Sequence, residues 1–161
     1  MIATAPELFK ALASTQVLAG TTLPAQTLIA KEGAVLDFAP GAWIVREGAE
    51  GHAFFILVEG DVEVVKYADT PRAVTLATLH SGCMFGEMCI LGPMPRAASI
   101  RALTQVKAIE IKAATLHHLY QSLPDQYAIV LLNLARDMAR QLCRLDEAYA
   151  ARAGLNSVGT N

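Results

Sequence analysis

The central part of the chain is a series of short segments in which apolar and polar residues alternate. They occupy most of residues 33–111, and turn signals such as Pro40-Gly41 and Glu59-Gly60-Asp61 separate them. Alternation with a period of two puts successive side chains on opposite faces of a β-strand. About eight such strands at this close spacing predict an antiparallel barrel or jelly roll. The segments with clear bounds are residues 33–39, 43–46, 53–58, 62–67, 73–79, 99–103 and 106–111.

Helical patterns flank this β-rich region on both sides. Apolar residues at roughly helical intervals predict an N-terminal helical segment within residues 5–30, although residues 21–30 also fit a loop with a short helical or strand piece. A short helix is expected over residues 113–121. Ser122-Leu123-Pro124-Asp125 then has the form of a helix start, and nothing breaks the helix before about Arg152.

These patterns together predict one α+β domain, mainly β, over residues 1–155. Its parts are the N-terminal helix, an eight-stranded antiparallel β-roll or jelly-roll barrel over residues 33–112 that includes one short helix, and C-terminal helices over residues 113–152. Residues 153–161 are expected to form a flexible tail. The length of 161 residues suits one domain with a real core. With 53% apolar and 17% charged residues, a disordered chain is excluded.

Charge and cysteine content restrict the partners and the compartment. A net charge of −2 gives no reason to expect nonspecific nucleic-acid binding, so direct DNA binding is not expected. No apolar run approaches the roughly 18 residues that cross a bilayer, and the N-terminus lacks the features of a signal peptide. Cys83, Cys89 and Cys143 show no metal-ligand spacing and form no even framework, which indicates reduced thiols and a cytoplasmic protein.

The most distinctive segment for function is residues 85–99, Phe-Gly-Glu-Met-Cys-Ile-Leu-Gly-Pro-Met-Pro-Arg-Ala-Ala-Ser. Gly86 lets a ligand approach the main chain closely, and the short apolar run after it is about one helical turn. Free N–H groups at the start of such a turn suit an anion, and Arg96 can add a bidentate grip on phosphate. The carboxylate of Glu87 suits a neighbouring hydroxyl. One hydroxyl acceptor, one cation and several backbone donors together describe a pocket for a sugar phosphate.

The same segment resembles the phosphate-binding cassette of cyclic nucleotide-binding domains. Residue types, their order and the nine-residue spacing from Glu87 to Arg96 all agree with that family, and Gly60 resembles its strand-turn-strand element. With the flanking helices, the resemblance covers residues 5–150. It implies that Glu87 accepts from the ribose 2′-hydroxyl and that Arg96 pairs with the cyclic phosphate. The ligand-binding residues that it implies are Phe85, Gly86, Glu87, Met88, Cys89, Arg96, Ala97, Ala98 and Ser99.

The resemblance also bears on the base. A threonine or serine directly after the arginine often favours guanine in this family, whereas Ala97 resembles the members that prefer cAMP. Ser99 can still reach a ligand, so a preference for cGMP stays open. The last helix of the family closes over the base, and an aromatic or apolar side chain suits a purine face. Lid candidates are Tyr127, Leu131 and Leu134, each of which also fits helix packing.

We therefore expect a stand-alone cytoplasmic sensor that binds cAMP and signals by moving its C-terminal helices. No output domain is recognisable, so an unidentified effector protein or self-association is expected to carry the signal. An apolar stripe along residues 124–150, at three- and four-residue steps, makes a helix-paired homodimer a hypothesis.

Several other interpretations stay open. Glu87 and Arg96 also fit a simple ion pair at the rim of the roll. The domain also fits an interaction scaffold that no longer takes a nucleotide, or a regulator without its own DNA-reading domain. A cupin-like metalloenzyme shares the fold class, but the His-x-His pattern of a cupin metal site is missing from the sequence. No metal is expected, and because no nucleophile–base pair stands out, neither is an enzyme.

Overall fold

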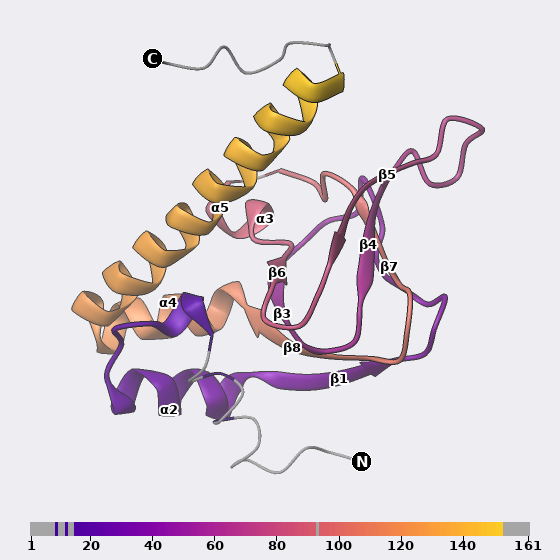
Figure 1. Cartoon of the computed structure of the whole chain (residues 1–161). Helices are drawn as coiled ribbons and strands as arrows, with labels where there is room; N and C mark the ends of the chain where they lie inside the picture. Colours follow the sequence, from indigo (N-terminus) through magenta and orange to yellow (C-terminus); the bar gives the residue numbers. More distant parts are fainter. Residues whose placement is uncertain (1–8, 10–11, 13–14, 93, 153–161) are drawn as a thin grey trace, which may run out of the picture.

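The computed structural model describes residues 9, 12, 15–92 and 94–152, and it contains two four-stranded antiparallel sheets. Figure 1 shows the sheets as a roll, with the helices gathered at one side of it. The strand order is β1-β8-β3-β6 in one sheet and β2-β7-β4-β5 in the other. The strands are β1 (Ala34–Phe38), β2 (Trp43–Val45), β3 (Ala53–Glu59), β4 (Val62–Lys66), β5 (Val74–Leu79), β6 (Met84–Phe85), β7 (Ser99–Ala102) and β8 (Val106–Lys112).

The structure confirms the predicted mainly β fold and refines its geometry. Among the described residues, no strand pairing joins the two sheets, so backbone hydrogen bonds do not close the roll into one barrel. Each segment expected from the alternating pattern forms a strand. Strand β6 was not expected, because two residues are too few to show an alternation.

The helices lie at the two ends of the described chain and in the segment after β6. They are η1 (Gln16–Leu18), α2 (Leu23–Glu32), α3 (Met88–Leu91), α4 (Ala113–Ser122) and α5 (Pro124–Arg152). The ambiguous residues 21–30 thus fall mainly in a regular helix, whose Leu23-Pro24 start places proline in the first turn. The helix expected before residue 20 falls partly outside the described residues; of its described part, Phe9 and Leu12 are helical and Gln16–Leu18 form a 3₁₀ turn. The expected tail after residue 152 lies outside the described residues as well.

Strand β3 separates two apolar cores. Its run Ala-Phe-Phe-Ile-Leu-Val is almost continuously apolar because both of its faces are covered. Phe54 and Ile56 pack under the helices, together with residues of α4 and α5. Phe55 and Leu57 point into the roll instead. The helical core thereby fixes the C-terminal helices directly against the strand that borders the candidate site.

Substitution Phe54→Ala is expected to destabilise the protein strongly, because this side chain is 1% exposed and touches the core beneath α4 and α5. Removing a buried phenylalanine ring costs about 3–5 kcal/mol in unfolding free energy. Urea unfolding followed by circular dichroism measures it. The control Leu132→Ala removes a 50% exposed side chain from α5, and a change within about 0.5 kcal/mol is expected. Equal losses for the two variants would contradict this assignment of the core.

Candidate functional site

The candidate site begins where β6 ends at Gly86. This residue has φ +83°, in the left-handed region that only glycine adopts at low cost. A β-carbon at this position would also collide with the guanidinium of Arg96. Gly86 is therefore required twice, once by the backbone turn into α3 and once by the close approach of the arginine.

The Arg96 side chain is buried against backbone carbonyls and is 8% exposed. Its Nη1 donates to the carbonyl of Gly86 at 2.8 Å and approaches Sγ of Cys89 at 2.9 Å. Its Nη2 donates to the carbonyl of Ala53 at 2.7 Å, and the guanidinium carbon lies 5.8 Å from the centre of the Phe55 ring. All of these partners are neutral. They orient the cation without cancelling its charge.

The described residues contain no ion pair between Arg96 and any carboxylate. The interpretation of Glu87 and Arg96 as a rim salt bridge therefore finds no support in the geometry. A buried cation without an anionic partner is electrostatically costly, and it strongly favours an added anion. Arg96 has the chemistry of an anion-binding group.

Glu87 is even more deeply buried, at 4% exposure. Its burial raises the pKa of the carboxyl group, and the nearby carboxylate of Asp137 raises it further. Its own backbone N–H, the side chain of Gln141 and the charge of Arg96 act in the opposite direction. Two of these groups belong to α5, so the long helix reaches the carboxylate that the sequence assigns to a ribose hydroxyl.

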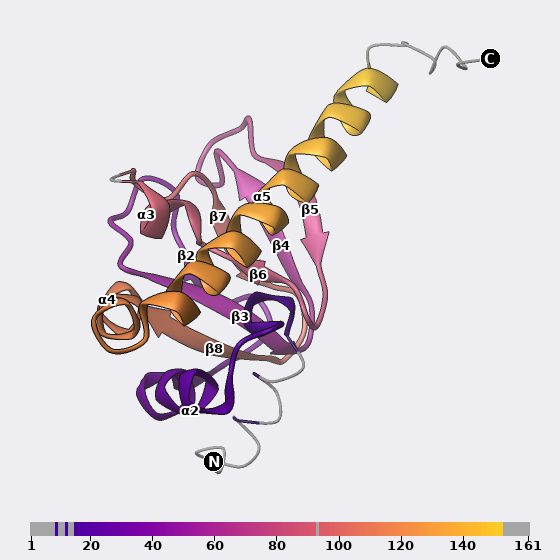
Figure 2. The ribbon, with the colours of Figure 1, turned by 90° about the vertical axis from the view of Figure 1, so that its left-hand side faces the viewer.

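The inward face of α5 changes character where it passes the site. Val130, Asn133 and Leu134 are buried in the first half of the helix. One and two turns further on, Asp137 and Gln141 are half-buried, and Nε2 of Gln141 donates to Oδ2 of Asp137 at 2.8 Å. Figure 2 shows α5 crossing the side of the roll that carries α3 and β6.

Sequence reasoning missed Asp137 and Gln141 as neighbours of the site. The available signal was the continuation of the buried helical face from Leu134 to polar residues three and seven positions later. The proposed lid residues lie elsewhere: Leu134 is 0% exposed in the helical core, and Tyr127 and Leu131 are partly buried against that core. The latter two also line a groove that α3, α4 and α5 share. Their role as a lid stays a prediction.

The remaining predicted residues of segment 85–99 differ in their surroundings. Phe85 is 4% exposed and stacks on Phe55 with ring centres 5.2 Å apart, which places it in the core of the roll. Met88 is 37% exposed, and the Cys89 thiol donates to the carbonyl of Gly86 at 3.1 Å.

The arm formed by residues 96–99 is held by the loop between β2 and β3. The N–H of Arg96 donates to the carbonyl of Ala49, and the N–H of Gly48 donates to the carbonyl of Arg96, both at 2.9 Å. Ser99 is 1% exposed, and its hydroxyl accepts from the N–H of Glu47 at 2.9 Å. Ala97 is exposed and Ala98 is half-buried.

A family model described as the cyclic nucleotide-binding domain matches residues 35–122. The chain belongs to this family. That range contains both Glu87 and Arg96 and ends with α4, so the family match covers the roll and the candidate site. The family assignment made from residues 85–99 is thereby confirmed.

Two curated relatives are regulatory proteins by name. The chain is 33% identical over 88 residues to a cAMP-dependent protein kinase regulatory subunit of Blastocladiella emersonii, a match that covers 55% of this chain and 22% of the relative. It is 28% identical over 129 residues to a CRP-like cAMP-activated global transcriptional regulator of Mycobacterium tuberculosis, covering 80% of this chain and 58% of the relative. The chain thus spans between about a fifth and three fifths of these relatives.

A solved structure supports the fold. The crystal structure of a cyclic nucleotide-binding domain from Methylobacillus flagellatus KT matches with a TM-score of 0.79 and 18% identity, covering 97% of this chain and 88% of that one. At this identity the likeness concerns the fold alone.

The described part of the chain contains neither a candidate metal cluster nor a candidate membrane-spanning helix. No group of three or more histidine, cysteine, aspartate or glutamate side chains gathers there in a way that could hold a metal ion. No helix in that part is long and apolar enough to cross a membrane.

Substitution Glu87→Gln is expected to stabilise the fold at neutral pH. Burial raises the pKa of Glu87, so the carboxyl group of Glu87 binds its proton more tightly in the folded protein than in the unfolded chain. The resulting stability is fully present below the ordinary pKa of 4.5 and is lost as the pH rises through the pKa in the folded protein. Scanning calorimetry should therefore show a Tm a few degrees above wild type at pH 7, with the difference shrinking toward pH 4.

The control for this measurement is Glu50→Gln, which neutralises a carboxylate whose side chain is 93% exposed. We expect little change in its Tm at either pH. A Glu87→Gln variant that is less stable than wild type at pH 7 would show that the folded state favours the charged carboxylate.

Proposed function

We propose that this domain is a sensor that binds 3′,5′-cyclic AMP in the roll and signals to a partner protein through its C-terminal helices. The buried guanidinium of Arg96 carries this proposal, because only neutral groups hold it at 8% exposure. The cyclic phosphate supplies one negative charge, and a guanidinium can bind two of its oxygens at once. The names of the relatives, a cAMP-dependent kinase subunit and a cAMP-activated regulator, support the choice of ligand.

In this proposal Glu87 accepts a hydrogen bond from the ribose 2′-hydroxyl, and backbone N–H groups around Gly86, Met88 and Ala97 complete the phosphate site. Ala97 has no hydroxyl to offer a guanine, which favours adenine. Preference for cGMP is the alternative for the base. The proposed ligand-binding residues are Phe85, Gly86, Glu87, Met88, Cys89, Arg96, Ala97, Ala98 and Ser99.

Helix α5 is the proposed output element. Gln141 of α5 favours the charged form of Glu87, the same carboxylate that would receive the ribose hydroxyl, and it donates a hydrogen bond to the neighbouring Asp137 at 2.8 Å. A nucleotide that binds Glu87 would thus change the surroundings of α5. It can shift the population between two positions of the helix only to the extent that it binds one position more tightly than the other. The effector that reads the shift is an unidentified cytoplasmic protein. This role needs no catalytic group.

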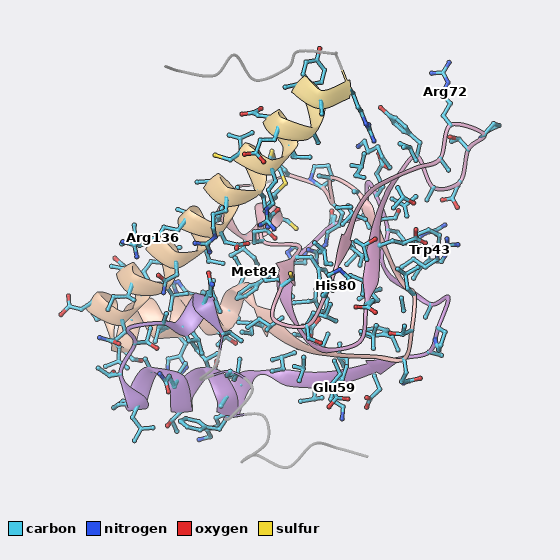
Figure 3. The ribbon with its side chains drawn as sticks, in the orientation of Figure 1. Trp43, Glu59, Arg72, His80, Met84 and Arg136 are labelled. Carbon is cyan, nitrogen blue, oxygen red and sulfur yellow. The ribbon has the colours of Figure 1, made fainter. Side chains whose placement is uncertain are left out.

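Loss of the Arg96 side chain is expected to abolish tight binding. Truncating one partner of a buried charge pair weakens affinity by roughly 2–5 kcal/mol, or about 30-fold to several thousand-fold. Calorimetric titration of Arg96→Ala with cAMP, on protein freed of nucleotide by refolding, measures the loss. Arg72→Ala is the matched control, because Arg72 lies on the connection between β4 and β5 that projects away from the rest of the roll (Figure 3). Wild-type affinity in a folded Arg96→Ala variant would locate the anion elsewhere.

Parallel titration of the wild type with cGMP tests the base. Tighter binding of cAMP supports the interpretation of Ala97, and tighter binding of cGMP contradicts it. If neither nucleotide binds, the scaffold interpretation of this fold takes its place.

A homodimer formed through residues 124–150 is a second proposal for the output. Past Leu134, the last buried residue of α5, the helix exposes Leu142, Leu145 and Tyr149 at 59%, 54% and 75%. These residues recur at steps of three and four, which a paired helix can cover. We expect light scattering to report a dimer at micromolar concentration, and Leu142→Glu with Leu145→Glu to convert it to a monomer. A wild-type monomer at high concentration, with and without cAMP, would contradict the dimer.

A further inference from the structure

A lysine from the second sheet reaches the arm that follows Arg96. Lys66, the last residue of β4, donates from Nζ to the carbonyl of Ala97 at 2.7 Å. The same ammonium lies 2.6 Å from Oε1 of Glu47, and the two side chains are 31% and 25% exposed. The ammonium thus joins the arm to the loop between β2 and β3.

Glu47 is itself firmly placed. Its Oε2 accepts from the N–H of Tyr67 at 2.8 Å, and its backbone N–H donates to the hydroxyl of Ser99. The hydrogen bond from Lys66 is the largest of the effects that lower the pKa of Glu47, so the carboxylate is charged and holds the lysine at neutral pH. The lysine therefore has a fixed anchor on one side and the arm on the other.

Two consecutive carbonyl groups of this arm, those of Arg96 and Ala97, each accept a hydrogen bond. The carbonyl of Arg96 accepts from the N–H of Gly48 at 2.9 Å, and the carbonyl of Ala97 accepts from Lys66. In a planar trans peptide the N–H points opposite to the carbonyl of the same unit. Fixing these two oxygens therefore turns the N–H groups of Ala97 and Ala98 away from the loop and from Lys66.

These two N–H groups are available for a ligand. Among the described residues, no hydrogen bond uses the N–H of Ala97 or of Ala98 as donor. They directly follow Arg96, whose guanidinium is held by neutral groups. Adjacent backbone N–H groups next to a cation form an anion-binding surface.

We infer that Lys66 and Glu47 are positioning residues for the phosphate: they hold the arm so that the N–H groups of Ala97 and Ala98 point at the anion bound by Arg96. This inference rests on the proposed function, since it assigns these donors to the cyclic phosphate. Lys66 does not contact the ligand. It acts through the carbonyl that it binds.

A merely structural ion pair would behave differently. Both side chains of this ion pair are still partly exposed, and ion pairs in contact with solvent contribute little to stability, so its loss should change Tm only slightly. If one backbone N–H group of the arm no longer points at the phosphate, the affinity for the ligand should instead fall by about 5- to 20-fold. Affinity and Tm therefore separate the two roles.

The test uses Lys66→Met, which keeps an apolar side chain of similar length and removes the ammonium. Calorimetric titration with cAMP should give an affinity about 5- to 20-fold weaker than wild type, with Tm nearly unchanged. The ³¹P resonance of bound cAMP should shift, because the donors around the phosphate change. Glu47→Gln should move both readouts the same way, and Lys66→Arg should restore most of the affinity.

Lys112→Met is the matched control, because it removes the same charge from an exposed residue at the end of β8. It should leave affinity and the ³¹P resonance at their wild-type values. If the wild type binds cAMP and Lys66→Met changes neither the affinity nor the ³¹P resonance, the positioning role is overturned and the proposed function stands. A wild type that binds neither cAMP nor cGMP overturns the proposed function, and the positioning role with it.

Discussion

The burial of the Arg96 guanidinium is the interaction on which the rest of the site depends. A cation removed from water needs compensation, and here carbonyl dipoles and one thiol provide it without an opposing charge. This arrangement demands open space around the arginine. Gly86 and Gly51 provide that space, since a β-carbon on Gly51 would lie 2.5 Å from Nε of Arg96. Two glycines distant in sequence are thus explained by one side chain.

Much of the fold could be predicted because its signals are local and repeated. The alternating segments specify the strands, and the start signal before Pro124 with an unbroken helical pattern specifies α5. Strand β6 could not be predicted, since two residues form a strand only through their pairing with β3. Whether two sheets close into a barrel is also decided by pairings between distant residues, which no local pattern encodes.

The candidate site follows the same division. Glu87 and Arg96 lie in one segment of fifteen residues, so their spacing could be interpreted from the sequence alone. Asp137 and Gln141 continue the buried face of α5, but this pattern alone does not say that they lie beside Glu87, because polar residues on a helix usually mark its solvated face. Lys66 and Glu47 were equally hidden, since their meeting depends on how β4 and the loop before β3 come together. The chemistry of residues within one segment could be predicted from the sequence, whereas the residues that other elements bring to the site could not.

The closure of the site has a kinetic consequence. Glu87 and Arg96 are 4% and 8% exposed, and residues of α5 lie near the carboxylate, so a nucleotide that is to bind both side chains must first uncover them. Association then requires an opening step that does not involve the nucleotide. The observed rate of binding should rise with nucleotide concentration and level off at the rate of opening, well below the limit set by diffusion. The speed of the response would then be a property of helix α5 rather than of the ligand.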